Sequence, residues 1–154
     1  MLLSTTKDIY LVMTGYLEYN IDNKTGLLYS TWTRPVSSFE FREGTMLLLD
    51  LVNRHGIGLW LCDSRSRDAL QLEDRAWLKA TYISQIRGSS LRKFATVPSL
   101  DVLLESEAYM LISYLNVTLN FLVQHEYHDT LEGALAWLFS DTPEQLCEAR
   151  PILG

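Results

Sequence analysis

A polar loop at residues 63–68 carries the densest group of potentially functional side chains in the sequence. It consists of Asp63-Ser64-Arg65-Ser66-Arg67-Asp68 and follows an apolar run. Two arginines could hold a carboxylate or a phosphate through paired N–H groups, and ligands of open α/β sheets bind where loops follow strands. We therefore predict a ligand-binding or regulatory loop made of Asp63, Ser64, Arg65 and Arg67. In the alternative, Asp63 only orients the loop, and the arginines pair with carboxylates nearby.

Two histidines in the segment His125-Glu126-Tyr127-His128 raise the question of a metal site. On a strand these two positions point to opposite faces, so a shared metal ion is not expected. Cys62 lies within an apolar run and Cys147 lies far from it in sequence, which predicts two reduced thiols without a catalytic role. No pattern for an activated nucleophile or a phosphate-binding glycine loop is found. The sequence predicts no enzymatic activity, no cofactor and no metal.

Apolar patterns predict the elements that would hold these side chains. Strands are expected at 9–21, 27–33, 57–63, 92–97 and 117–127. Helices are expected at 38–55, 72–87, 99–116 and 129–138. The turn-forming residues 22–26 would join the first two strands as a hairpin, and Gly15 would mark a bulge. The order β-β-α-β-α-β-α-β-α predicts an α/β fold, in which an N-terminal hairpin and βα units form a mixed sheet with packed helices.

Several local patterns make these expectations specific. Ser37 and Glu40 have capping-box spacing, and Gly56 suits the end of the first helix. The second helix is expected to bury a stripe of Leu72, Ala76, Ala80, Ile83 and Ile86/Arg87 and to keep Glu73 and Asp74 in solvent. Alternation from Val117 to Tyr127 predicts a strand with one wet face, at or near a sheet edge; a single long helix over 101–125 is the alternative. Arg87, Arg92 and Lys93 are expected in a solvated turn.

Bulk properties limit the class of protein. The chain has 154 residues, 47% apolar and 21% charged, which predicts one domain spanning 1–154 with a core at 9–139 and a loosely held tail at 140–154. A net charge of −6 makes nucleic acid an unexpected partner. No apolar run approaches 18 residues and the first ten residues lack a signal-peptide core, so no membrane span and a cytoplasmic location are expected.

A set of diffuse motifs resembles small bacterial proteins of the STAS-like or SpoIIAA-like class, the anti-sigma-factor-antagonist superfamily. The motifs are Trp60-Leu61-Cys62-Asp63-Ser64-Arg65, Glu73-Asp74-Arg75-Ala76-Trp77-Leu78, Arg92-Lys93-Phe94-Ala95, Tyr127-His128-Asp129 and Ala134-Leu135-Ala136-Trp137-Leu138. The resemblance covers roughly residues 10–139 and implies protein–protein regulation rather than catalysis. In the antagonists a serine at the place of Ser64 is phosphorylated, but here the loop is longer and lacks the glycine that follows that serine.

These observations favour a non-enzymatic regulatory or protein-interaction module with an unknown protein partner. The outer strand and exposed aromatic residues favour self-association, most simply as a two-fold dimer. The alternative is a carrier or sensor of a small apolar or acidic, lipid-like ligand, in which Trp60 and Trp77 would line a groove. A third alternative is an enzyme in which Asp63, Arg65 or a histidine converge in one cleft. The identity of any partner or ligand, the pathway and the modification state of Ser64 do not follow from the sequence.

Overall fold

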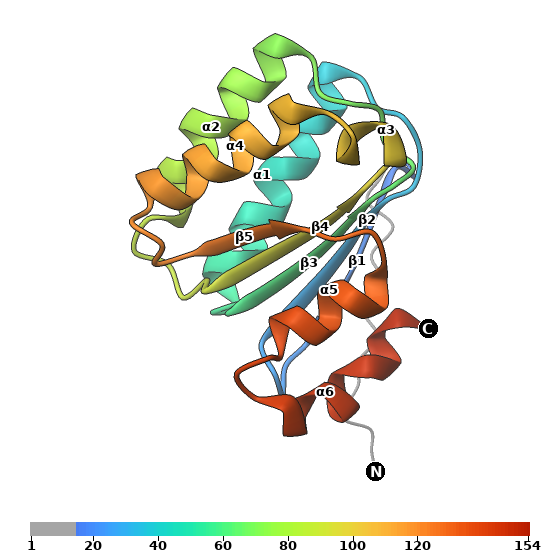
Figure 1. Cartoon of the computed structure of the whole chain (residues 1–154), viewed down its shortest axis with the longest axis vertical. Helices are drawn as coiled ribbons and strands as arrows, with labels where there is room; N and C mark the ends of the chain where they lie inside the picture. Colours follow the sequence, from blue (N-terminus) through green and yellow to red (C-terminus); the bar gives the residue numbers. More distant parts are fainter. Residues whose placement is uncertain (1–14) are drawn as a thin grey trace.

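The computed structural model describes residues 15–154, which form one five-stranded sheet with helices on both faces (Figure 1). The strands are β1 (Leu17–Asp22), β2 (Leu27–Trp32), β3 (Leu59–Ser64), β4 (Lys93–Pro98) and β5 (Gln124–Tyr127). The helices are α1 (Ser38–Arg54), α2 (Leu72–Ile86), α3 (Leu100–Leu103), α4 (Ser106–Thr118), α5 (Leu131–Leu138), α6 (Pro143–Ala149) and a final 3₁₀ turn (Arg150–Leu153). The predicted α/β class and element order are confirmed, with the third helix divided in two.

The strands stand in the sheet in the same order as in the chain, β1-β2-β3-β4-β5. β1 and β2 are antiparallel, and every later pair is parallel. Parallel crossovers are right-handed, so a sheet that always grows in one direction receives its connecting helices on one face. Figure 1 shows α1, α2 and α4 together on that face and α5 and α6 on the other.

The predicted hairpin is confirmed for the part of the chain that the structure describes, while residues 9–14 of the predicted first strand lie outside it. Leu17 pairs with Trp32 and Asp22 with Leu27. The Asp22 carboxylate accepts hydrogen bonds from the backbone N–H of Lys24 and the hydroxyl of Thr25, which closes the turn. Gly15 has a left-handed φ of 70° but precedes β1, so it does not form a bulge within the strand.

The central strand β3 is buried along its whole length, as expected for a strand covered on both faces. Its side chains alternate between the two faces. Leu59 and Leu61 belong to the apolar cluster on the side of α5, and Trp60 and Cys62 belong to the larger cluster on the side of α1, α2 and α4.

Helix α1 begins and ends as predicted. The Ser37 hydroxyl accepts the N–H of Glu40, and the Glu40 carboxylate accepts the N–H of Ser37. Gly56, with φ of 59°, follows the C-terminal cap. Inside the helix, a Cβ on Gly44 would lie 2.7 Å from the Trp32 ring, so glycine at this position lets α1 pack closely on β2.

The buried face of α2 was predicted correctly in its last turn and wrongly before it. Ile86 is buried and Ile83 packs against the core as expected. Leu72, Ala76 and Ala80 are exposed, however, whereas Asp74 and Tyr82 are buried. Polar groups can be buried when they are hydrogen-bonded. The Asp74 carboxylate accepts hydrogen bonds from Ser38 and Arg42 of α1, so the first turn of α2 is tied to α1 rather than solvated.

The predicted strand over 117–127 is wrong in its first half. Helix α4 continues to Thr118, and a turn with left-handed residues at Asn120 (φ 55°) and Phe121 (φ 56°) leads to the short strand β5. The apolar alternation from Val117 to Val123 therefore spans a helix end and a turn. The placement of the strand at the sheet edge is confirmed by the strand order.

The segment expected to be a loosely held tail, 140–154, contains α6 and the 3₁₀ turn. Ala149 is buried there, and Ile152 and Leu153 pack against the apolar cluster on the side of α5. Within residues 15–154, no helix has the length and apolar character needed to cross a membrane.

Candidate functional site

The predicted loop after β3 divides into two parts. Asp63 and Ser64 are buried at the end of the strand, and Arg65 is exposed. The Asp63 carboxylate accepts both edge N–H groups of Arg65, from Nε at 3.0 Å and from Nη2 at 2.8 Å, and also the backbone N–H of the same residue. Both oxygens of the Asp63 carboxylate therefore accept hydrogen bonds from Arg65. The two arginines of the loop therefore do not form a common clamp.

Arg67 turns the other way, into the protein. Its guanidinium carbon lies 5.0 Å from the ring centre of Phe41 and 5.5 Å from that of Trp32. The residue as a whole is half-buried, but Nε and Nη1 are shielded from solvent and have no hydrogen-bond partner among the described residues. Burial lowers the pKa of the guanidinium from its usual value, although arginine remains charged at neutral pH. An unpaired charge of this kind is costly, and the two aromatic rings offset part of that cost.

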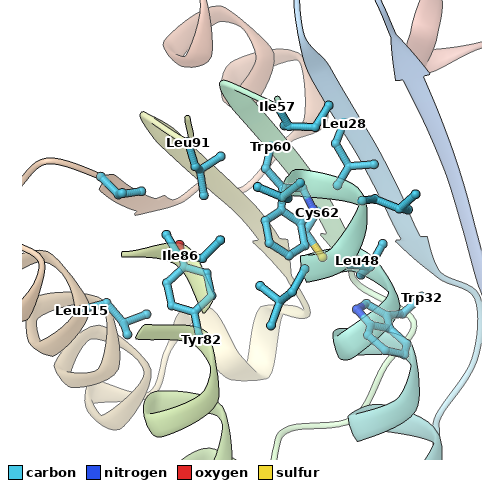
Figure 2. Packing of buried hydrophobic residues seen from close by; sticks show 14 of the residues in the cluster. Leu28, Trp32, Leu48, Ile57, Trp60, Cys62, Tyr82, Ile86, Leu91 and Leu115 are labelled. Carbon is cyan, nitrogen blue, oxygen red and sulfur yellow. The ribbon is translucent and has the colours of Figure 1, made fainter. Parts of the chain in front are cut away.

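The Arg67 side chain lines a cavity of about 100 Å³ between the sheet and helices α1, α2 and α4. Its walls are mostly apolar. Polar groups come from Ser64, Thr96 and Tyr127 in addition to Arg67, and these four also border a smaller neighbouring cavity of about 50 Å³. Figure 2 shows the interior between the sheet and the helices, with Trp60 and Cys62 on the sheet side. The polar end lies where β3, β4 and β5 finish, the usual edge for ligands in parallel sheets.

The two tryptophans predicted to line a groove are separated. Trp60 is buried and lines the cavity; its Nε1 donates to the Ser30 hydroxyl at 2.9 Å, and its ring stacks on Phe94 with the centroids 4.0 Å apart. Trp77 is not among the cavity residues and packs against Phe41 and the Arg42 guanidinium.

A buried hydrogen-bonded chain that the sequence interpretation missed borders the same cavity. The Tyr82 hydroxyl and His125 Nε2 are 2.6 Å apart, and His125 Nδ1 is 2.8 Å from Asn116 Oδ1. Because the amide oxygen only accepts, Nδ1 carries the proton and Nε2 accepts from Tyr82. Burial lowers the pKa of His125 to about 4 and raises that of Tyr82 well above its usual value. The expectation of a solvated His125 is therefore wrong.

The nucleophiles around the cavity are held in their protonated forms. Burial raises the pKa of the Cys62 thiol, whose Sγ lies 3.4 Å from the Ser64 hydroxyl. Asp63 and Arg65 are not among the cavity residues, so they do not meet His125 in one cleft. His125 and His128 lie on opposite faces as predicted, His125 against Tyr82 and His128 against Trp137 of α5. Within residues 15–154, no three metal-ligating side chains converge.

The outer side of α4 is a second candidate site, which we call the α4 face and define by Tyr109, Met110, Tyr114 and Val117. These side chains are 48%, 67%, 46% and 62% exposed, and with Ser106, Ser113 and Thr118 they line a shallow groove of about 620 Å³. Natural monomers rarely expose contiguous apolar surface of this kind unless it binds something. The spacing of these residues on one helix was the available signal, but the sequence interpretation began a strand at Val117 and so divided the set.

Comparisons with known proteins add a likeness of fold. A crystal structure of an uncharacterised protein from the DUF3478 family with a SpoIIAA-like fold, from Shewanella loihica PV-4, is similar to this chain with 17% sequence identity and a TM-score of 0.49. The match covers 73% of this chain and 83% of that one. No protein-family model and no curated protein matches the sequence.

Proposed function

We propose that this chain is a non-enzymatic interaction module of the STAS-like type, and that it assembles through the α4 face with a second copy of itself. The exposure of Tyr109, Met110, Tyr114 and Val117 on one side of a single helix is the observation that carries the proposal. Burying these side chains against each other removes apolar surface from water, the main driving force of association.

The charge around the α4 face favours a second copy as the occupant. Glu107 is the one charged residue in α4, and it is neutralised by Arg75 at 2.9 Å. Lys79 lies with its amine 4.8 Å from the ring centre of Tyr114, at the border of the face. A two-fold interface brings a surface against its own image, so the surface must not repel itself. Other surfaces of this acidic chain would bring like negative charges together in a two-fold dimer, which is unfavourable.

Exposed apolar side chains also flank both ends of α4. Leu104 precedes the helix, Phe121 and Leu122 follow it, and all three are at least 60% exposed. Apolar side chains near the α4 face add to the surface that association can remove from water.

The state of the buried groups supports a non-enzymatic role. Cys62, Tyr82 and His125 all have pKa values moved away from neutrality by burial, in the direction that keeps each group uncharged. Acid–base and nucleophilic catalysis need groups poised near the working pH. The buried Ser64 hydroxyl also gives a kinase no direct access, so the proposal places the interaction at α4 rather than at a phosphorylated loop.

Light scattering after size-exclusion chromatography, over a dilution series, tests this proposal. We expect a dimer in the micromolar range. Met110→Lys places two amines near the two-fold axis and is expected to weaken association about 100-fold or more. Met46→Lys, on α1 where Met46 is 40% exposed, is the matched control and should remain dimeric. A wild-type monomer at all micromolar concentrations, or equal dissociation of both variants, would overturn the proposal.

A further inference from the structure

We propose that the cavity between the sheet and helices α1, α2 and α4 binds a small organic monocarboxylate, held by the Arg67 guanidinium. This site is independent of the α4 face. The inference rests on three observations: a buried cation without a counter-ion, a cavity at that cation, and walls that suit an apolar body.

The Arg67 guanidinium has two shielded nitrogen atoms without a hydrogen-bond partner among the described residues. A planar guanidinium presents paired N–H groups along two edges that match the two oxygens of a carboxylate. One atom of each edge, Nε or Nη1, is shielded and unpartnered in the described part of the chain. Buried polar atoms are nearly always satisfied, so an unsatisfied pair on a charged group calls for a ligand or water. A ligand carboxylate would satisfy either edge completely.

The acidic side chains around Arg67 do not form an ion pair with it. Asp63 is bound on both oxygens by Arg65, and Asp74, whose charge is felt at Arg67, accepts from Ser38 and Arg42. Asp68 and Glu105 border the smaller cavity beside Arg67, but neither pairs with its guanidinium. Among residues 15–154 the guanidinium has no ion-pair partner within 4.0 Å. The chain has more acidic than basic residues and a net charge of −6, so an arginine without an ion-pair partner is unexpected.

The walls define the rest of the ligand. Trp60 and Phe94 stack 4.0 Å apart and, with Leu78, Leu111 and Leu115, give the cavity apolar surfaces. Apolar cavities near 150 Å³ hold a benzene ring, so a space of about 100 Å³ fits a smaller body, a short aliphatic chain of about four carbons. The hydroxyls of Ser64, Thr96 and Tyr127 border the polar end beside Arg67 and can donate to the same carboxylate.

The charge balance favours a monoanion. One guanidinium and neutral hydroxyls compensate one negative charge, while a phosphate dianion would leave an unpaired charge against Trp60 and Phe94. Inorganic phosphate is thus expected to bind weakly or not at all, and serves as a probe that separates a carboxylate site from a general anion site.

Calorimetric titration of the full chain at constant ionic strength tests the site, with melting temperature as a second readout. We expect sodium butyrate to bind and to raise the melting temperature, while butanamide and inorganic phosphate do neither. If butanamide bound as tightly as butyrate, the ligand's charge would play no role and the proposal would be overturned. No response to butyrate, or a stronger response to phosphate, would overturn the proposed ligand class.

Variants connect binding to Arg67. Arg67→Met should weaken butyrate binding about 10- to 100-fold, since it removes a charge-assisted hydrogen-bonded pair. Arg67→Lys should be intermediate, because a single amine lacks the paired geometry. Arg65→Met, in the exposed pair outside the cavity, is the matched control and should bind as the wild type does. Unchanged butyrate binding by Arg67→Met would refute the site. If that variant does not fold, the comparison of butyrate with butanamide on the wild type still tests the proposal. Titration of Met110→Lys separates this result from dimer formation.

Discussion

Two cationic side chains, Lys93 and Arg67, lie on opposite faces of the sheet and differ in whether the protein supplies their polar partners. Lys93 of β4 faces α5, and its amine contacts the Trp137 carbonyl at 3.1 Å, the Ser140 hydroxyl at 2.8 Å and the Asp141 carboxylate at 3.1 Å. Arg67 faces α1, α2 and α4 and finds only aromatic rings. The cationic amine of Lys93 caps the C-terminal end of α5, where carbonyl groups are free. Lys93 therefore stabilises the fold, whereas the Arg67 guanidinium is available to bind a ligand.

The same contrast extends to the packing around each cation. The cluster on the α5 side consists of aliphatic and small residues with one aromatic ring: Leu27, Leu59, Leu61, Ala95, Val97, Ala134, Leu135, Leu138, Phe139 and Ala149. The opposite side mixes aromatic and polar groups around a cavity. Successive side chains of β3 and β4 point to opposite faces, so the same strands contribute to the aliphatic cluster on one face and to the aromatic and polar cavity on the other. One face stabilises the fold by close packing, and the other is built to hold a ligand.

The largest expected effect is on the packed face. Phe139 is fully buried in the cluster on the α5 side, so Phe139→Ala should lower the free energy of unfolding by about 3–5 kcal/mol, because it removes contacts and leaves a cavity. Denaturant unfolding measures this change. Phe39→Ala, at a position of α1 that is 73% exposed, is the control and should cost less than about 0.5 kcal/mol. A loss below about 2 kcal/mol for Phe139→Ala would mean that this face is not closely packed.

The second effect is acid sensitivity of the cavity face. The pKa of folded His125 is about 4, against 6.5 for an ordinary histidine, so the unfolded chain takes up this proton first as the pH falls. Stability from this group is complete above pH 6.5 and is lost as the pH falls toward 4, by about 3 kcal/mol in total. His125→Gln should remove this part of the pH dependence. Unfolding curves at several pH values for both proteins provide the measurement; parallel profiles would contradict a neutral buried imidazole.

The smallest effect compares the two cations directly. Lys93→Met should cost about 1–3 kcal/mol, because it removes the donor to the Ser140 hydroxyl, one of the donors to the Trp137 carbonyl and the ion pair with Asp141. Arg67→Met should change stability by less than about 0.5 kcal/mol or increase it, because the loss of an uncompensated charge offsets the loss of the aromatic contacts. Thermal unfolding of both variants at pH 7 measures the difference. Equal destabilisation would show that Arg67, too, is a structural cation.

The parts of the fold that follow from local chemistry were predictable. The Ser37–Glu40 cap, the glycine after α1 and the apolar run of β3 depend on neighbours in sequence, and all three are confirmed. The α2 face was missed because its buried positions include Asp74 and Tyr82, which become acceptable only through partners on α1 and β5. A strand was wrongly predicted at 117–123, where α4 ends and a turn with two left-handed residues follows, because alternation alone does not distinguish this arrangement from a strand.

The cavity beside Arg67 lies at the loop that the sequence singled out, but its arrangement and the α4 face did not follow from the sequence. The residue types at 63–68 and the place of the loop after β3 led to the part of the chain that contains Arg67. Arg65 binds Asp63 and Arg67 has no such partner. Which of the two arginines pairs with Asp63 depends on the direction of their side chains, and the spacing of the residues in the sequence does not reveal that direction. The His125 contacts and the α4 face depend on tertiary positions that one strand or one helix pattern does not contain.

The strand order has a consequence for how the protein is made. Each strand pairs with the strand synthesised just before it, so the sheet can grow in the direction of translation and with short loops to close. Helices α5 and α6, which cover Leu27, Leu59 and Leu61, emerge last from the ribosome. Until then a growing chain carries one finished face and one bare apolar face. Premature termination before residue 131 would release a product with a complete sheet and an aggregation-prone surface, a natural target for chaperones.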